Sequence, residues 1–111
     1  MEITTEIRDG VDIVSVTGRL TADCAADFKK QMLEILNEQA KIVLDLAGME
    51  YIDSTGLGAM VHVLQKVSDA GKQLNLARIQ AKPRLVFNIT RVYKLFDIFD
   101  TVDEAVGALN G

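Results

Sequence analysis

The sequence predicts one α/β domain, residues 1–111, in which helices pack on a mixed β-sheet. Two features indicate this fold class. An Asp-Gly pair joins two β-like segments near the N-terminus, and beyond it short β-branched runs alternate with amphipathic stretches of helical period. Such alternation is typical of parallel strands joined by helical crossovers. With 49% hydrophobic residues, a chain of this length can bury a core as one unit.

Residues 3–17 are expected to form a β-hairpin. In residues 3–7 the apolar side chains Ile3 and Ile7 fall on one face, while residues 11–17 have apolar side chains on both faces. The pair Asp9-Gly10 between them is a strong tight-turn signal, because glycine adopts a positive φ at little cost. We expect the second strand to end at Gly18.

Four amphipathic stretches then alternate with three strands, which gives the order ββαβαβαβα. The first helix lies within residues 21–40, the second begins at Asp53-Ser54-Thr55 and ends near Gly71, the third has Pro83 in its first turn, and the fourth opens with a capping-box pattern formed by Thr101 and Glu104. The apolar faces expected of the first three are Ala25, Phe28, Met32, Ile35 and Leu36; Leu57, Met60, Val61, Leu64 and Val67; and Leu85, Val86, Ile89 and Val92. The strands are residues 41–46, 73–79 and 95–100.

Composition excludes several function classes. Twelve basic and sixteen acidic residues give a net charge of −4, and no basic cluster offers a stripe for nucleic acid. No signal peptide and no apolar run of roughly 18 residues is present, so a cytoplasmic protein without membrane contact is expected. One cysteine, Cys24, and one histidine, His62, cannot form a Cys/His metal cluster within one chain. We therefore expect no metal and no cofactor.

Enzymatic chemistry finds little support. Ser54 and His62 lie eight residues apart, about 12 Å along a helix, which is too far for a Ser-His pair. Cys24 is more readily explained as a small packed side chain than as a nucleophile. The stretch Ser-Thr-Gly-Leu-Gly lacks the lysine and spacing of a phosphate-binding loop. The carboxylates Asp45, Glu50 and Asp53 fit caps and solvated loops as well as an acid pair. The prediction is a protein that is not an enzyme.

The stretch from Asp53 to Gly58 carries more polar groups and glycines than a helix start needs. Asp53 or Ser54 can serve as the N-cap. Gly56 and Gly58 would leave the first-turn backbone open to a partner protein. A phosphate on Ser54 could be held by the helix N–H groups, yet it would add roughly −1.5 to −2 charges next to an acidic loop and repel a docked partner. From the residues alone, a plain cap and a phosphorylation switch both stay open.

These residues carry a resemblance to a known family. Residues 42–65, IVLDLAGMEYIDSTGLGAMVHVLQ, are similar to the signature of STAS domains, specifically of bacterial anti-sigma factor antagonists. The N-terminal hairpin, the GKQLNLARI strand and the segment RLVFNITRVYKLFDIFDTVDEAV are similar to family segments as well. The resemblance therefore extends over nearly the whole chain.

The resemblance implies an anti-sigma factor antagonist that acts by partner switching. In this family the unphosphorylated protein binds an anti-sigma serine kinase and so releases a sigma factor or other target. Phosphorylation of the serine after the loop aspartate, here Ser54, ends binding, and a metal-dependent serine/threonine phosphatase restores it. By the same carry-over, Asp53 shapes the loop, and the kinase-facing surface includes Thr55, Gly56, Leu57 and Gly58. A monomer is expected.

One residue departs from the family pattern. Thr21 stands where many phosphorylated members have an aspartate near the phosphorylation loop, and the next aspartate is Asp23. Arg19 could approach a phosphate on Ser54, although a solvated surface arginine is the simpler interpretation. The alternative function on the same fold is a constitutive STAS binding subunit of a transport or signalling complex, and a small hydrolase using Ser54 would lack a base.

Overall fold

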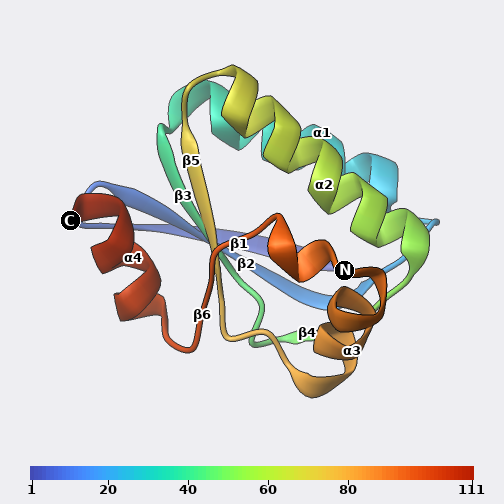
Figure 1. Ribbon diagram of the computed structural model, residues 1–111. Coiled ribbons are helices and arrows are strands. Elements are labelled where there is room, and N and C mark those ends of the chain that lie inside the picture. The colour runs from blue at the N-terminus through green and yellow to red at the C-terminus, as the bar shows by residue number, and fades with distance from the viewer.

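Strands and helices alternate along the chain. The computed structural model describes residues 1–111, and Figure 1 follows them from the N-terminal hairpin to the C-terminal helix. The elements are β1 (Glu2–Arg8), β2 (Val11–Leu20), α1 (Ala25–Glu38), β3 (Lys41–Asp45), β4 (Met49–Ile52), α2 (Ser54–Asp69), β5 (Gln73–Ala77), α3 (Ala81–Thr90), the 3₁₀ helix η1 (Val92–Lys94), β6 (Ile98–Phe99) and α4 (Val102–Asn110). The predicted α/β class is confirmed, and the predicted order gains β4 and η1.

The strands form one mixed sheet with the order β1-β2-β3-β5-β6. β1 and β2 are antiparallel, whereas β3, β5 and β6 join β2 in parallel. Both residues of the hairpin turn have positive φ, 53° for Asp9 and 78° for Gly10. These are the backbone values that a two-residue type I′ turn requires. The hairpin prediction is therefore confirmed.

The second strand does not end at Gly18, which corrects the expectation from the sequence. Gly18 has a φ of 87°, and the register between β2 and β4 shifts between Gly18 and Arg19. The shift leaves one extra residue, Glu50, on β4, and such an irregularity does not end the strand opposite it. β2 therefore continues to Leu20, and its last residues pair in parallel with β4. β4 has only four residues, too few for a periodic pattern to reveal it.

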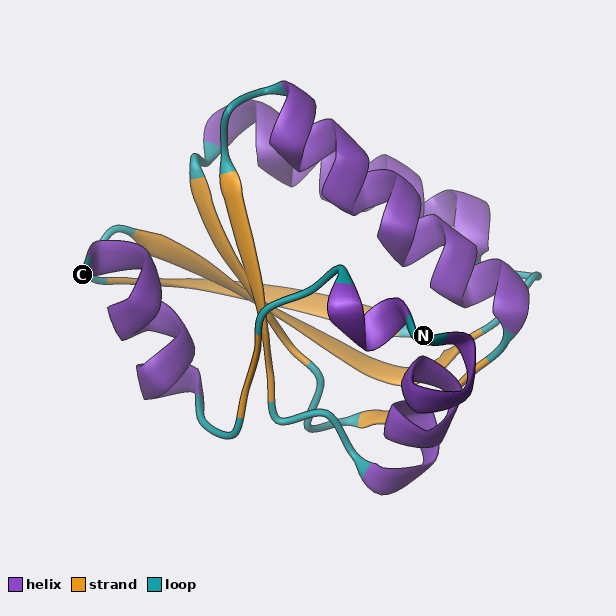
Figure 2. Ribbon diagram, in the orientation of Figure 1, coloured by secondary structure: helices purple, strands orange, loops and turns teal.

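Helices cover both faces of the sheet (Figure 2). α1 and α2 lie together over one face, above a core of 22 buried residues. α4 lies on the other face, over a cluster of seven. β2 contributes to both cores by alternation, because Val14 and Val16 belong to the larger one and Val11 and Ile13 to the smaller one. α1 buries Ala25, Phe28, Met32 and Leu36, nearly as predicted.

The third helix buries a different face from the one expected. Its buried residues are Pro83 and Phe87, whereas Leu85 and Ile89 are 57% and 76% exposed. The ring of Phe87 packs on that of Phe96, with centroids 5.9 Å apart. An aromatic side chain contributes more buried area than a leucine or isoleucine. The prediction was wrong because this aromatic pair, rather than the aliphatic stripe, fixes how α3 is rotated.

Candidate functional site

Asp53 joins the start of α2 to the loop that follows β2. Its Oδ1 accepts a hydrogen bond of 2.7 Å from the backbone N–H of Gly56, which makes Asp53 the N-cap. Its Oδ2 accepts a second bond of 2.9 Å from the N–H of Ala22. Its own N–H donates to the carbonyl oxygen of Leu20 at 3.2 Å. A single half-buried carboxylate therefore holds two loops in a fixed relation.

Ser54 and Thr55 are exposed at the first two positions of α2. The first hydrogen bond of helical spacing in α2 runs from the N–H of Leu57 to the carbonyl of Asp53, and Asp53 already occupies the N–H of Gly56. The N–H groups of Ser54 and Thr55 consequently have no partner within the helix. The arrangement places an exposed hydroxyl beside open donors at the positive end of a helix dipole.

The two glycines of this turn have different roles, and the role expected of Gly56 is corrected. A Cβ on Gly56 would lie 2.2 Å from the carbonyl oxygen of Leu20, so this glycine allows α2 to pack against β2. Leu57 is also buried, at 4% exposure, and belongs to the larger core. Gly58, in contrast, is exposed and has nothing within 4 Å of the Cβ position. Of the predicted partner-facing residues, only Thr55 and Gly58 are exposed, and Asp53 is half-buried.

The loop between β2 and α1 lies beside this turn and carries its own carboxylate. The hydroxyl of Thr21 donates to Asp23, and this hydrogen bond holds the pKa of the Asp23 carboxyl below its usual range. Cys24 packs against the larger core, and its Sγ lies 3.3 Å from the carbonyl oxygen of Arg19. Thr21 thus orients the exposed carboxylate two residues further on.

Arg19 is exposed at the surface, as expected, and it also stacks on an aromatic ring. Its guanidinium carbon lies 4.6 Å from the ring centroid of Tyr51, a cation–π arrangement. Both side chains border an open hollow of about 670 Å³ between β4 and the N-terminus of α3. The other lining residues are Ala47, Gly48, Met49, Glu50, Gln80, Ala81, Lys82 and Pro83. One of its lining residues, Tyr51, lies three residues before Ser54 in the chain. No motif in the sequence indicated this hollow.

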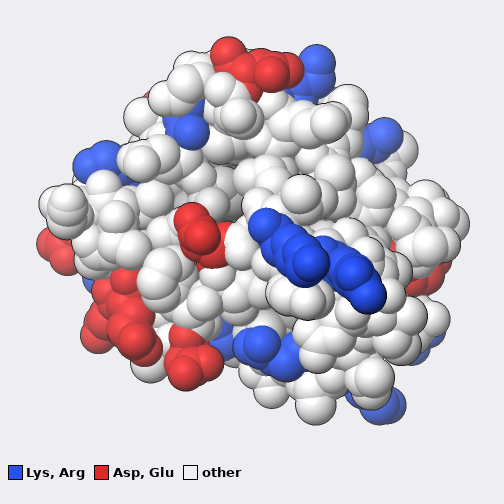
Figure 3. Space-filling model, viewed as in Figure 1, with Lys and Arg blue, Asp and Glu red and all other residues white.

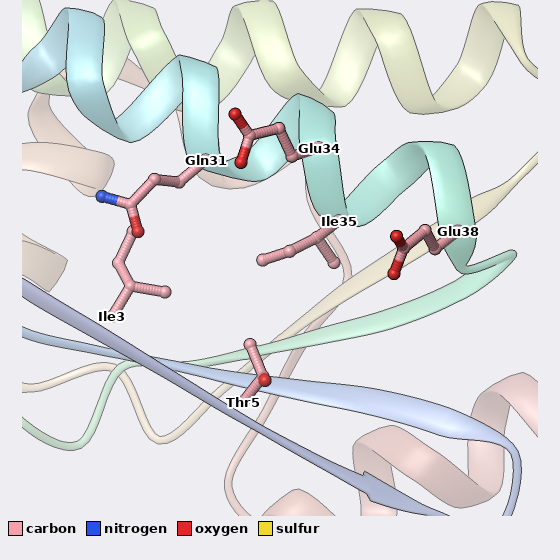
Figure 4. Close-up of a pocket in the computed structure, with 6 residues that line it drawn as sticks. All are labelled: Ile3, Thr5, Gln31, Glu34, Ile35 and Glu38. Carbon is pink, nitrogen blue, oxygen red and sulfur yellow. The ribbon is translucent and has the colours of Figure 1, made fainter.

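A smaller hollow of about 320 Å³ lies between α1 and β1 (Figure 4). Its lining residues are Ile3, Thr5, Gln31, Glu34, Ile35 and Glu38. None of them is a predicted site residue. No group of three or more His, Cys, Asp or Glu side chains is placed to hold a metal ion, and no helix has the length and apolar character needed to cross a membrane.

The three carboxylates near the site do not form an acid pair. Asp45 is buried and accepts a hydrogen bond of 2.9 Å from Nε of Arg78, whose pKa this carboxylate raises. Glu50 is exposed, and both oxygens of Asp53 are used by backbone N–H groups. Arg78 was not among the residues singled out, because its partner lies 33 positions away in the sequence.

Both the sequence and the fold of this chain are similar to those of known proteins. The family model of the STAS domain matches residues 2–105. The chain belongs to the STAS family. This STAS domain is 33% identical to a protein of Thermotoga neapolitana named as a candidate anti-sigma factor antagonist, over 96% of each chain. The crystal structure of a candidate anti-sigma factor antagonist from Thermotoga maritima has a TM-score of 0.91 at 31% identity, covering 98% of this chain and 95% of the other.

The same STAS fold occurs in a phosphorylated protein. The structure of the Bacillus cell fate determinant SpoIIAA in its phosphorylated form has a TM-score of 0.72 at 14% identity, over 96% of this chain and 98% of the other. At that identity the likeness concerns the fold alone. The anti-sigma factor antagonists that this STAS domain resembles are generally regulators without enzymatic activity.

Proposed function

We propose that this STAS domain is an anti-sigma factor antagonist that works by partner switching, with Ser54 as the phosphoacceptor. The unphosphorylated form binds an anti-sigma serine kinase and frees the sigma factor or other target of that kinase. Phosphorylation of Ser54 ends the binding, and a metal-dependent serine/threonine phosphatase restores it. The contact surface comprises Thr55 and Gly58, while Asp53, Gly56 and Leu57 hold it in shape.

The observation that carries this proposal is the position of Ser54. Its hydroxyl is exposed at the first residue of α2, next to N–H groups that have no partner within the helix. A phosphate there gains hydrogen bonds from its own chain. To a docked partner, the same phosphate presents roughly −1.5 to −2 new charges that must be desolvated. The phosphate therefore costs little in the free protein and weakens the complex.

Phosphorylation with a matched control tests the acceptor. The anti-sigma kinases of the source organism, purified one by one, are incubated with ATP and the wild-type protein, and intact mass is measured. We expect one kinase to add a single phosphate to the wild type and to Thr55→Ala, and none to Ser54→Ala. Thr55 is the matched control because it is the neighbouring exposed hydroxyl. Undiminished phosphorylation of Ser54→Ala would rule out this acceptor.

Binding to the same kinase tests the switch. The Ser54→Asp variant adds a negative charge at the acceptor position, and we expect its dissociation constant to rise by at least roughly a few-fold relative to the wild type. Ser68→Asp makes the same substitution at an exposed serine of α2 outside the contact surface and serves as the control. Equal affinity of Ser54→Asp and the wild type would contradict release by charge.

A further inference from the structure

Positive charge is concentrated in the segment formed by α3 and η1. Residues 81–96 contain four of the 12 basic residues and none of the 16 acidic ones. The rest of the chain consequently has eight basic and sixteen acidic residues, a net charge of −8. In Figure 3 basic side chains lie over the region of α3 and η1, whereas acidic side chains gather over α4. The segment therefore stands out against an otherwise acidic molecule.

Exposed apolar side chains are concentrated in the same segment. The molecule has seven exposed large apolar side chains, and four of them are Leu85, Ile89, Tyr93 and Leu95, with exposures from 41% to 76%. We call the surface formed by these four and by the basic residues Lys82, Arg84, Arg91 and Lys94 the α3 surface. Clustered exposed apolar side chains rimmed by charge mark an interaction site more often than scattered ones do.

The α3 surface continues into the region of Ser54. Lys82, Leu85 and Ile89 are spaced at i, i+3 and i+7, so they lie on one face of α3. Lys82 also lines the hollow that Arg19 and Tyr51 border. α3 packs against β4, the strand that ends two residues before Ser54 (Figure 1). A partner that covers the Ser54 turn and this hollow can extend onto α3 without leaving the protein surface.

We propose that the α3 surface binds an acidic amphipathic segment of the anti-sigma kinase, as a second contact beside the Ser54 turn. This inference rests on the proposed function. Apolar side chains of such a segment would cover Leu85 and Ile89, and its carboxylates would face the four basic residues. Because Ser54 is not part of the α3 surface, this contact contributes affinity in both phosphorylation states, and the phosphate acts on the other contact.

Other occupants fit the charges less well. A symmetric contact between two copies would bring four basic residues of one α3 surface against four of the other, which is unfavourable. Nucleic acid would leave the exposed leucines and isoleucine without an apolar partner. An anionic membrane would repel the part of the chain outside residues 81–96, which has a net charge of −8. An acidic amphipathic protein segment satisfies both the charge and the apolar groups.

Two double variants and a control test the second contact. The probe is the kinase that phosphorylates Ser54 in the assay above. Leu85→Asp with Ile89→Asp removes the apolar part, and Lys82→Glu with Arg84→Glu reverses the charge. Acidic residues in the first turn of α3 favour the helix dipole, so the second variant should keep its fold. Lys30→Glu with Lys66→Glu makes the same charge change at exposed positions of α1 and α2.

Both α3 variants should bind the kinase at least about tenfold more weakly than the wild type, and the control should stay within about twofold. Their melting temperatures, measured alongside, should match that of the wild type. Lys82→Glu with Arg84→Glu should also lose most of the salt dependence of binding. At saturating concentration the kinase should still phosphorylate Ser54 in both variants, because the acceptor is intact.

Three outcomes would overturn the inference. If Ser54→Asp weakens binding but both α3 variants bind like the wild type, the proposed function stands and the second contact does not. If no kinase phosphorylates the wild type, both fall together. If phosphatidylglycerol vesicles sediment the wild type but not Leu85→Asp with Ile89→Asp, while kinase affinity is unchanged, the α3 surface is a membrane contact.

Discussion

Asp53 shows how one side chain can organise the turn that begins α2. Its two carboxylate oxygens accept hydrogen bonds from the N–H of Gly56 and from the N–H of Ala22. Ala22 lies 31 residues before Asp53, so this side chain joins two segments that are distant in the chain. Hydrogen bonds to an ionised acceptor are roughly twice as strong as neutral ones. Because both oxygens already accept from Gly56 and Ala22, Asp53 accepts no hydrogen bond from the backbone N–H groups of Ser54 and Thr55. The cap that a sequence suggests for α2 thus also fixes the neighbouring β2–α1 loop.

Unlike Asp53, Asp12 has a carboxylate oxygen without a hydrogen-bond partner, and its titration should affect the stability of the fold. It is a buried carboxylate on β2, and its Oδ1 has no hydrogen-bond partner. Burial, followed by the nearby charge of Glu38, raises its pKa. The folded state therefore holds this proton to higher pH than the unfolded state does. The ionised form destabilises the fold above the raised pKa, and this penalty is relieved as pH falls through that pKa to about 4.

Replacing Asp12 by asparagine should remove this pH dependence. At pH 7 we expect Asp12→Asn to raise the free energy of unfolding by about 1–3 kcal/mol, since a buried charge without a partner is lost. At pH 4 the difference from the wild type should be smaller. Urea denaturation at both pH values measures it, with the exposed loop residue Asp100→Asn as the control. An equal difference at both pH values would contradict the assignment to Asp12 ionisation.

The start of α2 contains two glycines for which opposite mutational effects are expected. A Cβ at Gly56 would meet the carbonyl oxygen of Leu20 at 2.2 Å, whereas a Cβ at Gly58 would meet nothing within 4 Å. Gly58→Ala should stabilise the protein by about 0.5–1 kcal/mol, because alanine favours a helix. Gly56→Ala should destabilise it by about 1–3 kcal/mol through overpacking. Thermal denaturation of the two variants checks this, and effects of the same sign would contradict it.

Local signals made most elements predictable, and contacts between distant segments explain the failures. The Asp9-Gly10 turn, the Thr101 cap, whose hydroxyl accepts from the N–H of Glu104 at 3.1 Å, and the buried stripe of α1 depend on neighbouring residues. The role of Gly56 depends on Leu20, 36 positions earlier, and the rotation of α3 depends on Phe96. The Ser54 turn could be singled out from the sequence because its residues are contiguous, whereas the hollow beside it joins three separated segments.

The two cores divide the molecule into parts that share only the sheet. The larger core lies beneath α1 and α2, and Ser54 begins one of these helices; the smaller core lies beneath α4 on the opposite face. The hydrogen bond from Arg78 to Asp45 links the end of β3 to the residue that follows β5. A charge added to the exposed Ser54 side chain displaces no buried group. The proposed switch should therefore change the surface of the protein without changing its fold.

The Ser54→Asp variant separates a change of surface from a change of fold. A carboxylate in the first turn of α2 is favoured by the helix dipole and opposed by Asp53, so we expect the free energy of unfolding to change by less than about 1 kcal/mol in either direction. Amide chemical shifts should change in the Ser54 turn, the β2–α1 loop and β4, and should stay constant in α4. Shift changes that reach α4, or a loss of several kcal/mol, would mean that the added charge rearranges the whole domain. In that case the loss of kinase binding would report altered folding, whereas an unchanged α4 together with weakened binding would assign the effect to charge at the surface.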